Sequence, residues 1–137
     1  MSQQETVRSM LTSADVAQLP IRDRIGLVIE ARDVTTAITR IREAEYAGIR
    51  QAWMTQSVGM LDTLTLFAAV ATHTTRIRLG TSIVPIYPRH PLVMALQAAT
   101  IDALAPGRLR LGVGTKSPQR DGKRLWPFDG VPTGVFA

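Results

Sequence analysis

The residues between 76 and 114 constrain the fold more than any other part of the chain. A short apolar run at 77–84 is followed by a loop that contains three prolines, and then by a helical pattern at 92–104. A Pro-Gly pair ends that pattern, and a second apolar run occupies 109–113. Two strands joined by one helix through tight turns form a parallel crossover unit. In parallel α/β folds the functional groups lie at the carboxyl ends of the strands.

The same strand-and-helix unit repeats along the chain. Strand candidates begin near Ile25, Gln51, Ile77 and Leu109, which gives offsets of 26, 26 and 32 residues. A unit of strand, helix and two loops needs about 30 residues. This alternation predicts a parallel sheet covered by helices, either as an open doubly wound sheet or as part of a (β/α)8 barrel. A full barrel takes about 250 residues, so four parallel βα units correspond to half of one.

Three segments between the strand candidates have helical periodicity. The first carries one apolar stripe between residues 34 and 44, with Asp33 as its N-cap and Gly48 as its C-terminal stop. The second helix is expected over about 62–73. The third begins with Pro91, whose missing N–H costs nothing in the first turn. We expect its inward face to consist of Leu92, Ala95, Leu96, Ala99 and Ala103.

Composition narrows the class of protein. The 137 residues fit one domain, 45% of them are apolar, and none of the apolar runs approaches the roughly 20 residues of a membrane span. There is no cysteine, which excludes disulfides and thiolate zinc sites, and the polar N-terminus lacks the apolar core of a secretory signal. The expected location is the cytoplasm. Net charge is +5, but the basic residues are spread along the chain, so no nucleic-acid partner is expected.

The ends of the chain differ from its repeated region. We expect a flexible N-terminal arm at 1–23, the repeated βα region at 24–115, and an irregular C-terminal tail at 116–137. The tail shows neither helical nor strand periodicity, and glycine and proline recur in it every few residues.

The segments LGTSIVPIYPRHP and ALQAATIDALAPGRLRLGVG resemble the luciferase-like flavin monooxygenase superfamily, and within it the branch that depends on coenzyme F420. The resemblance covers about 24–115 and is most specific over 79–114. It implies a partial (β/α)8 TIM-type barrel, the N-terminal half only. It also implies an oxidoreductase that binds F420, with FMN as the alternative, and that acts on a small organic substrate by hydride transfer or oxygen insertion.

The resemblance also places the cofactor against strand ends. In the family the third strand often ends in a bulge with a non-prolyl cis peptide that backs the central ring, and here that bulge falls at Ser82 and Ile83. Gly112 and Gly114 would clear room for the ring, although they can also be read as turn glycines. The expected cofactor-binding residues are Thr81, Ser82, Ile83, Gly112, Gly114 and Thr115.

Three residues are candidates for catalysis. His90 opens the third helix within an Arg-His-Pro sequence that the resemblance places near the site, although it can equally be a simple N-cap. Gln56 ends the second strand, where many relatives carry an acid or a histidine; it can form hydrogen bonds but cannot transfer a proton near neutral pH. Glu30 is the nearest carboxylate at that edge, with a solvated loop residue as the alternative. No metal site is expected, because two histidines 17 residues apart define no ligand geometry.

Half a barrel leaves two open sheet edges and an uncovered inner face. Three accounts of the chain therefore stay open. It is a truncated enzyme that is inactive alone, a half-barrel that closes with a second copy by two-fold symmetry, or a binding or interaction module without catalysis.

Overall fold

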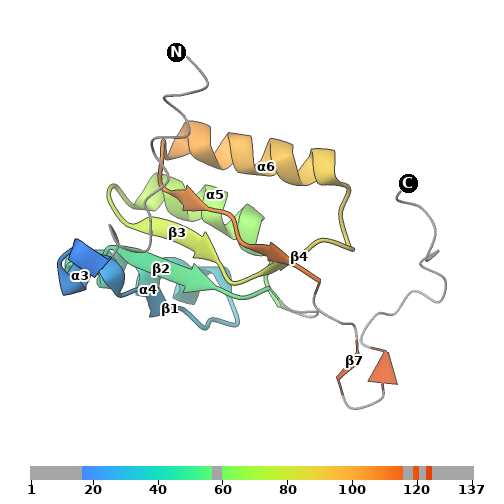
Figure 1. The fold of residues 1–137 in the computed structure, drawn as a ribbon, viewed down its shortest axis with the longest axis horizontal. Helices are drawn as coiled ribbons and strands as arrows, with labels where there is room; N and C mark the ends of the chain where they lie inside the picture. Colours follow the sequence, from blue (N-terminus) through green and yellow to red (C-terminus); the bar gives the residue numbers. More distant parts are fainter. Residues whose placement is uncertain (1–16, 57–59, 116–118, 121–122, 125–137) are drawn as a thin grey trace.

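In the computed structural model, helices and strands alternate as the sequence predicts (Figure 1). The structure describes residues 17–56, 60–115, 119–120 and 123–124. Its main elements are α3 (Ile21–Arg24), β1 (Leu27–Val28), α4 (Val34–Tyr46), β2 (Gln51–Met54), α5 (Thr63–His73), β3 (Arg78–Thr81), β4 (Val84–Pro85), α6 (Pro91–Leu104), β5 (Leu109–Arg110) and β6 (Val113–Gly114).

The four expected strands form one parallel sheet in the order β1-β2-β3-β5. Strand order follows chain order, and each connection passes through a helix, which is the arrangement of consecutive βα units in a barrel. The apolar runs at 77–84 and 109–113 are each interrupted, and their second parts, β4 and β6, form a separate parallel pair. The predicted fold class, four parallel βα units of a partial barrel, is confirmed.

Side-chain caps fix where the helices begin. The Asp33 carboxylate accepts a hydrogen bond from the Thr36 backbone N–H at 2.8 Å, and the Asp62 carboxylate accepts one from the Thr65 N–H at 3.0 Å. Each satisfies a donor that the first turn leaves without an intrahelical partner. Gly48 follows the end of α4 with φ of 84°, a conformation that glycine adopts readily, so the predicted stop is confirmed.

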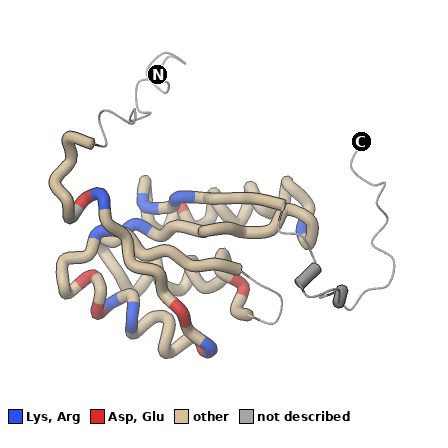
Figure 2. The backbone as a smooth tube through the Cα atoms, turned by 60° about the horizontal axis from the view of Figure 1, so that its bottom comes forward, with Lys and Arg blue, Asp and Glu red and all other residues tan. Residues whose placement is uncertain are grey.

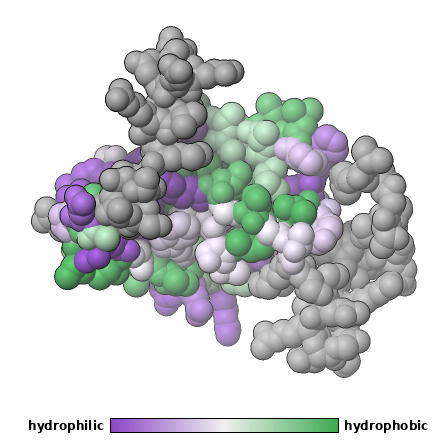
Figure 3. Space-filling view, in the orientation of Figure 1, coloured by the Kyte–Doolittle hydropathy of each residue, from purple (hydrophilic) through white to green (hydrophobic). Residues whose placement is uncertain are grey.

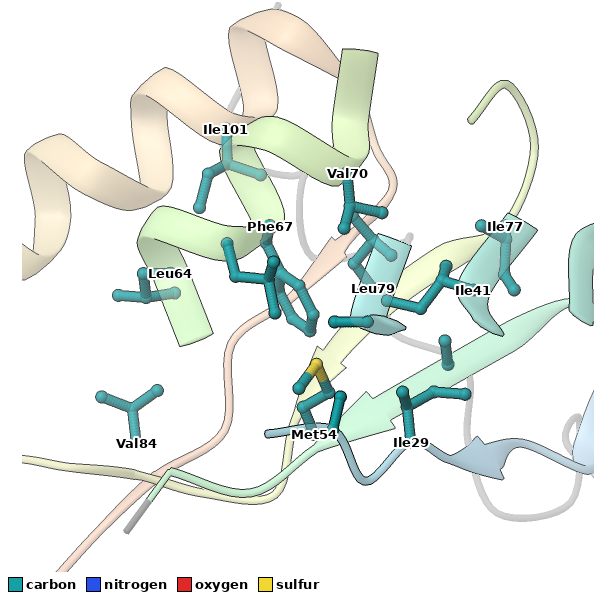
Figure 4. Close-up of a cluster of buried hydrophobic side chains, with 14 of the residues drawn as sticks. Ile29, Ile41, Met54, Leu64, Phe67, Val70, Ile77, Leu79, Val84 and Ile101 are labelled. Carbon is teal, nitrogen blue, oxygen red and sulfur yellow. The ribbon is translucent and has the colours of Figure 1, made fainter. Parts of the chain in front are cut away.

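The core lies between the sheet and helices α4 and α5. Phe67 on α5 is fully buried and points toward the strands, next to Leu79 and Met54 (Figure 4). Ile41 on α4 and Val70 on α5 are equally buried. Burying a side chain of this size contributes about 1.5–3 kcal/mol, so this cluster supplies much of the stability of the repeated region.

The predicted inward face of α6 is wrong. Leu92, Ala95, Leu96, Ala99 and Ala103 are all exposed, and Leu96 keeps 60% of its accessible surface. Met94 and Ile101 are buried instead, seven residues apart on the side that packs on α5. The helix is apolar almost all round, so periodicity alone did not select a face. Its exposed leucines contribute to the apolar surface seen over α6 in Figure 3.

The predicted arm and tail contain short elements. Helix α3 lies partly within the region expected to be a flexible arm, and strands β7 (Gln119–Arg120) and β8 (Lys123–Arg124) form an antiparallel pair within the expected irregular tail. The sequence between these strands is Asp-Gly, which favours two-residue hairpin connections. The rest of both predicted segments, 1–16 and 125–137, lies outside the described residues. In the part of the chain that is described, none of the helices has the length and apolarity needed to span a membrane.

Candidate functional site

The carboxyl ends of β2 and β3 are joined by a set of backbone hydrogen bonds. The Ser82 N–H donates to the Met54 carbonyl at 2.8 Å, and the Gln56 N–H donates to the Ile83 carbonyl at 3.2 Å. The Thr55 hydroxyl donates to the Ser82 carbonyl at 2.7 Å. The Ser82–Ile83 peptide bond is cis, as the resemblance implied. Ser82 is exposed and Ile83 half-buried, and the strand end that these two residues form is called the strand-end platform below.

Thr81 ties β3 to the next strand rather than facing the platform. Its hydroxyl donates to the Gly112 carbonyl at 2.7 Å and accepts from the Gly112 N–H at 2.8 Å. The residue is only 1% exposed. Beyond this point the Val84 N–H donates to the Gly112 carbonyl at 2.9 Å, and the Ile86 N–H donates to the Gly114 carbonyl at 3.1 Å. Thr81, Gly112 and Gly114, three of the predicted cofactor-binding positions, thus take part in one hydrogen-bonded ladder, while Ser82 and Ile83 are bonded to the end of β2.

Gly112 and Gly114 allow the two chain segments to approach closely. A Cβ atom on Gly112 would lie closer than 3.0 Å to the Thr81 carbonyl oxygen, and one on Gly114 would lie 2.6 Å from the Ile83 side chain. Neither glycine has the positive φ that a turn glycine would show. The lack of a side chain therefore lets Gly112 pack against the end of β3 and lets Gly114 pack against Ile83. Thr115, which follows them, is exposed.

His90 is the N-cap of α6. Its Nδ1 accepts a hydrogen bond from the Leu92 N–H at 3.2 Å, so the predicted N-cap geometry is present. The side chain is exposed at the same end of the sheet as the platform, because it follows β4 and precedes α6.

An ion pair that the sequence analysis missed holds the loop before His90. The Arg89 guanidinium pairs with Asp62, the N-cap of α5, and also donates to the Gln97 side chain at 3.3 Å. Partial burial acts to raise the pKa of the Asp62 carboxyl, but hydrogen bonds from Thr65 and the Arg89 charge outweigh it, so the net pKa is lowered. Asp62 was recognisable as a helix start, whereas nothing local in the sequence identifies a partner 27 residues away.

The other two catalytic candidates follow the ends of neighbouring strands, Gln56 after β2 and Glu30 after β1. The Gln56 side-chain oxygen accepts a 3.4 Å hydrogen bond from the Thr63 N–H, which links the end of β2 to the first turn of α5. Glu30 follows β1, is exposed, and its backbone carbonyl accepts a hydrogen bond from Arg40. The structure therefore brings Gln56 directly to the platform, while Glu30 lies at the end of the neighbouring edge strand.

Charges in the described part of the chain are dispersed over several elements (Figure 2). The Arg108 side chain makes its hydrogen bonds within the fold: it donates to the Ala71 carbonyl at 2.9 Å and to the Thr74 hydroxyl at 3.0 Å. Among the described residues, His, Asp and Glu side chains form no group of three that could hold a metal ion.

Parallel βα units with a strand-end platform define the class of protein: this is part of a (β/α) barrel whose candidate site lies at the carboxyl ends of its strands. Residues 13–127 match the family described as luciferase-like monooxygenase. The chain belongs to this family, as the resemblance in its sequence implied.

Two kinds of relatives illustrate the match. The chain is 31% identical over 104 residues to 5,10-methylenetetrahydromethanopterin reductase from Methanopyrus kandleri, an alignment that covers 75% of this chain and 30% of the relative. It is 35% identical over 108 residues to the pyrimidine monooxygenase RutA from Methylobacterium radiotolerans, covering 77% of this chain and 27% of the relative. The chain thus spans less than a third of the length of these relatives.

Solved structures agree on the fold. The coenzyme F420-dependent tetrahydromethanopterin reductase from Methanopyrus kandleri superposes with a TM-score of 0.63 at 30% identity, over 68% of this chain and 27% of that one. The oxygenating constituent of 3,6-diketocamphane monooxygenase from Pseudomonas putida, solved in complex with FMN, gives a TM-score of 0.61 over 67% of this chain and 29% of that one. Its 19% identity supports the fold alone.

Proposed function

We propose that this chain forms the strand-end part of the cofactor site in a luciferase-like oxidoreductase that uses coenzyme F420, with FMN as the alternative, on a small organic substrate. The observation that carries the proposal is the strand-end platform of Ser82 and Ile83, which is hydrogen-bonded to the end of β2 and is followed directly by β4, the partner of β6. Family membership and a related structure described as F420-dependent support the choice of cofactor.

The residues of the platform fit one face of a flat conjugated ring. Ser82 is small and exposed, Ile83 and Pro85 are half-buried apolar residues, and the backbone between them is fixed by hydrogen bonds. The exposed hydroxyls of Ser82 and Thr115 can bind polar atoms at the rim of such a ring. When bound, the cofactor would supply the hydride or oxygen chemistry, and the protein would supply orientation.

The remaining candidates divide between proton handling and positioning. Glu30 and His90 are the proposed groups for holding or moving a proton, since both are exposed beside the carboxyl ends of the strands. Gln56 is proposed to orient the substrate or cofactor by hydrogen bonding, because its amide is itself oriented by the Thr63 N–H. Thr81, Gly112 and Gly114 would act by keeping β3 and its neighbour at the spacing that the platform requires.

Because the chain spans less than a third of its relatives, binding and turnover are separate parts of the proposal. We expect the chain to bind the ring of the cofactor and to be inactive in turnover by itself. A module that binds without any catalytic role in the cell is the alternative. A cytoplasmic location is also proposed, and cell fractionation tests it.

Titration of the purified chain with reduced F420 and, separately, with reduced FMN, followed by absorbance and fluorescence, tests the site. We expect Ser82→Trp to weaken binding by more than about tenfold, because a large side chain would occupy the platform. Thr39→Trp, at an exposed position on α4, is the matched control and should leave binding unchanged. Equal affinity of the two variants, or no binding of either cofactor by the unmodified chain, would contradict the proposal.

A further inference from the structure

The segment between β4 and α6, residues 86–90, covers its charged side chain and exposes its large apolar ones. Ile86 and Tyr87 are 38% and 53% exposed, whereas the Arg89 side chain keeps only 14% of its accessible surface. A charged side chain is rarely covered unless it is paired with a group of opposite charge or with hydrogen-bond acceptors. Polar contacts of Arg89, rather than apolar packing, therefore hold this segment against the rest of the fold.

The contacts of Arg89 tie the segment to two helices. The guanidinium forms an ion pair with Oδ1 of Asp62, the N-cap of α5, and donates to the Gln97 side chain on α6 at 3.3 Å. A guanidinium presents its donors in a fixed plane, so contacts with two partners at once fix the orientation of the side chain. The residue directly before His90 is thus held by α5 and α6 together.

The Asp62 carboxylate serves both the helix and the arginine. Its Oδ2 accepts two hydrogen bonds from Thr65, from the backbone N–H at 3.0 Å and from the hydroxyl at 2.6 Å, so Oδ1 is left for Arg89. At the cap of α4 the corresponding bonds from Thr36 go to different oxygens of Asp33, at 2.8 Å and 2.7 Å. Asp33 forms no ion pair with a described residue. The two caps therefore share one chemistry and differ in the arginine.

The same turn of α5 also holds Gln56, one of the candidate catalytic residues. The Gln56 Oε1 accepts a hydrogen bond from the Thr63 N–H at 3.4 Å, and Thr63 directly follows Asp62. Two neighbouring residues of one helical turn thus contact the residue after β2 and the segment that leads to His90. The position of His90 relative to Gln56 therefore depends on this turn.

We propose that Asp62 and Arg89 are positioning residues of the candidate site. Their ion pair holds segment 86–90 against the first turn of α5, which also orients Gln56, and so fixes where His90 lies relative to Gln56. Neither residue needs to touch the ligand for this role. The effect of the pair on ligand binding rests on the proposed function, whereas its effect on the order of the segment does not.

Backbone order parameters from ¹⁵N relaxation of the purified chain test the restraint without any ligand. Asp62→Asn keeps a side-chain oxygen for the N-cap but loses the negative charge that pairs with Arg89. In the unmodified chain we expect order parameters of about 0.85 for the Tyr87 and His90 amides, as for rigid backbone. In Asp62→Asn we expect both to fall below about 0.6, while the amide of the buried Val70 stays rigid.

Asp33→Asn is the matched control for this measurement. It makes the same chemical change at the aspartate cap of α4, and it should leave the order parameters of the Tyr87 and His90 amides unchanged. A segment that stays rigid in Asp62→Asn would overturn the proposal. So would equal loosening of the segment by Asp33→Asn, because the effect would then come from any weakened cap and not from the pair with Arg89.

A second variant covers failure of Asp62→Asn to fold, which circular dichroism would show. Arg89→Gln leaves the cap of α5 intact, removes the guanidinium, and should loosen the segment to the same extent. Arg89→Lys keeps the charge but lacks the planar fork that contacts Asp62 and Gln97 together, so we expect intermediate order parameters. A segment in Arg89→Gln as rigid as that of the unmodified chain would show that the pair does not hold it.

Titration with reduced F420 and with reduced FMN then tests the positioning role. We expect Asp62→Asn and Arg89→Gln to bind about five- to tenfold more weakly than the unmodified chain, because a loose segment must be ordered on binding. The double variant should bind no more weakly than either single one, since each removes the same pair. Loosening of the segment without any loss of affinity would refute positioning. If the unmodified chain binds neither cofactor, the proposed function is wrong, and the order parameters still decide whether the pair restrains the segment.

Discussion

Glu45, in the last turn of α4, holds the start of β3 through its carboxylate. Its Oε1 accepts hydrogen bonds from the backbone N–H groups of Arg76 at 2.5 Å, Ile77 at 2.8 Å and Thr75 at 3.0 Å. Glu45→Ala removes all three. The donor of the buried Ile77 would lose its partner, at about 1–3 kcal/mol, while the two exposed donors can bind water and lose about 0.5–1 kcal/mol each. We expect the free energy of unfolding to fall by about 2–5 kcal/mol.

Urea unfolding followed by circular dichroism measures this change as a lower midpoint at an unchanged slope. Glu43→Ala is the matched control: it removes the same charge from the same helix at an exposed position, and we expect less than about 0.5 kcal/mol. If the two variants differ by less than that amount, the bonds to Glu45 do not stabilise the fold and the reasoning is refuted.

The pH dependence of stability follows from the same group. Partial burial acts to raise the pKa of the Glu45 carboxyl. Hydrogen bonds from the backbone of Arg76, Ile77 and Thr75 lower the pKa by more than burial raises it, so the net pKa is below the ordinary value. A folded-state pKa below the unfolded one gives stability that is complete above the unfolded pKa and is lost as pH falls through the folded one. The stability difference between the unmodified chain and Glu45→Gln should therefore narrow on acidification from about pH 7 to about pH 3.

Three further predictions concern side-chain packing and the acid dependence of stability. Gly112→Ala should lower the melting temperature more than Gly114→Ala, because the first new methyl meets a backbone oxygen and the second meets the flexible end of a side chain. Ile101→Ala should cost about 2–5 kcal/mol in urea unfolding, whereas Leu96→Ala should cost less than about 0.5 kcal/mol, since only the first is buried. Asp62→Asn should flatten the acid dependence of stability, because the lowered pKa of this carboxyl stabilises the fold only above that pKa.

The fold class could be predicted from the sequence because the signals that define its strands and helices are local. The four strand candidates and the cap residues Asp33 and Gly48 could be located by reading about fifteen residues at a time. The helices between the strands then predict that the strands run parallel, with right-handed connections. The order of the strands, which differs between a doubly wound sheet and a barrel, is given by the structure. A helix such as α6, whose apolar residues surround the whole axis, carries no local signal for its buried face, and that face could be assigned only from its packing on α5.

The contacts within the candidate site were harder to predict from the sequence, because they join segments that are far apart in the chain. The residues at the strand ends could be named from their positions, since parallel strands bring their carboxyl ends together. The pairing of Asp62 with Arg89 and the double hydrogen bond between Thr81 and Gly112 connect residues 27 and 31 positions apart. Such partners are fixed by register and loop length, which no single segment encodes.

The positive charges of the described residues are not placed to bind an anion at the strand-end platform. Arg89, the guanidinium at that end of the sheet, is already paired with Asp62. Arg78 begins β3, at the opposite end of that strand from Ser82. The platform is therefore better suited to a neutral ring than to a charged group, because a charged group needs a partner of opposite sign.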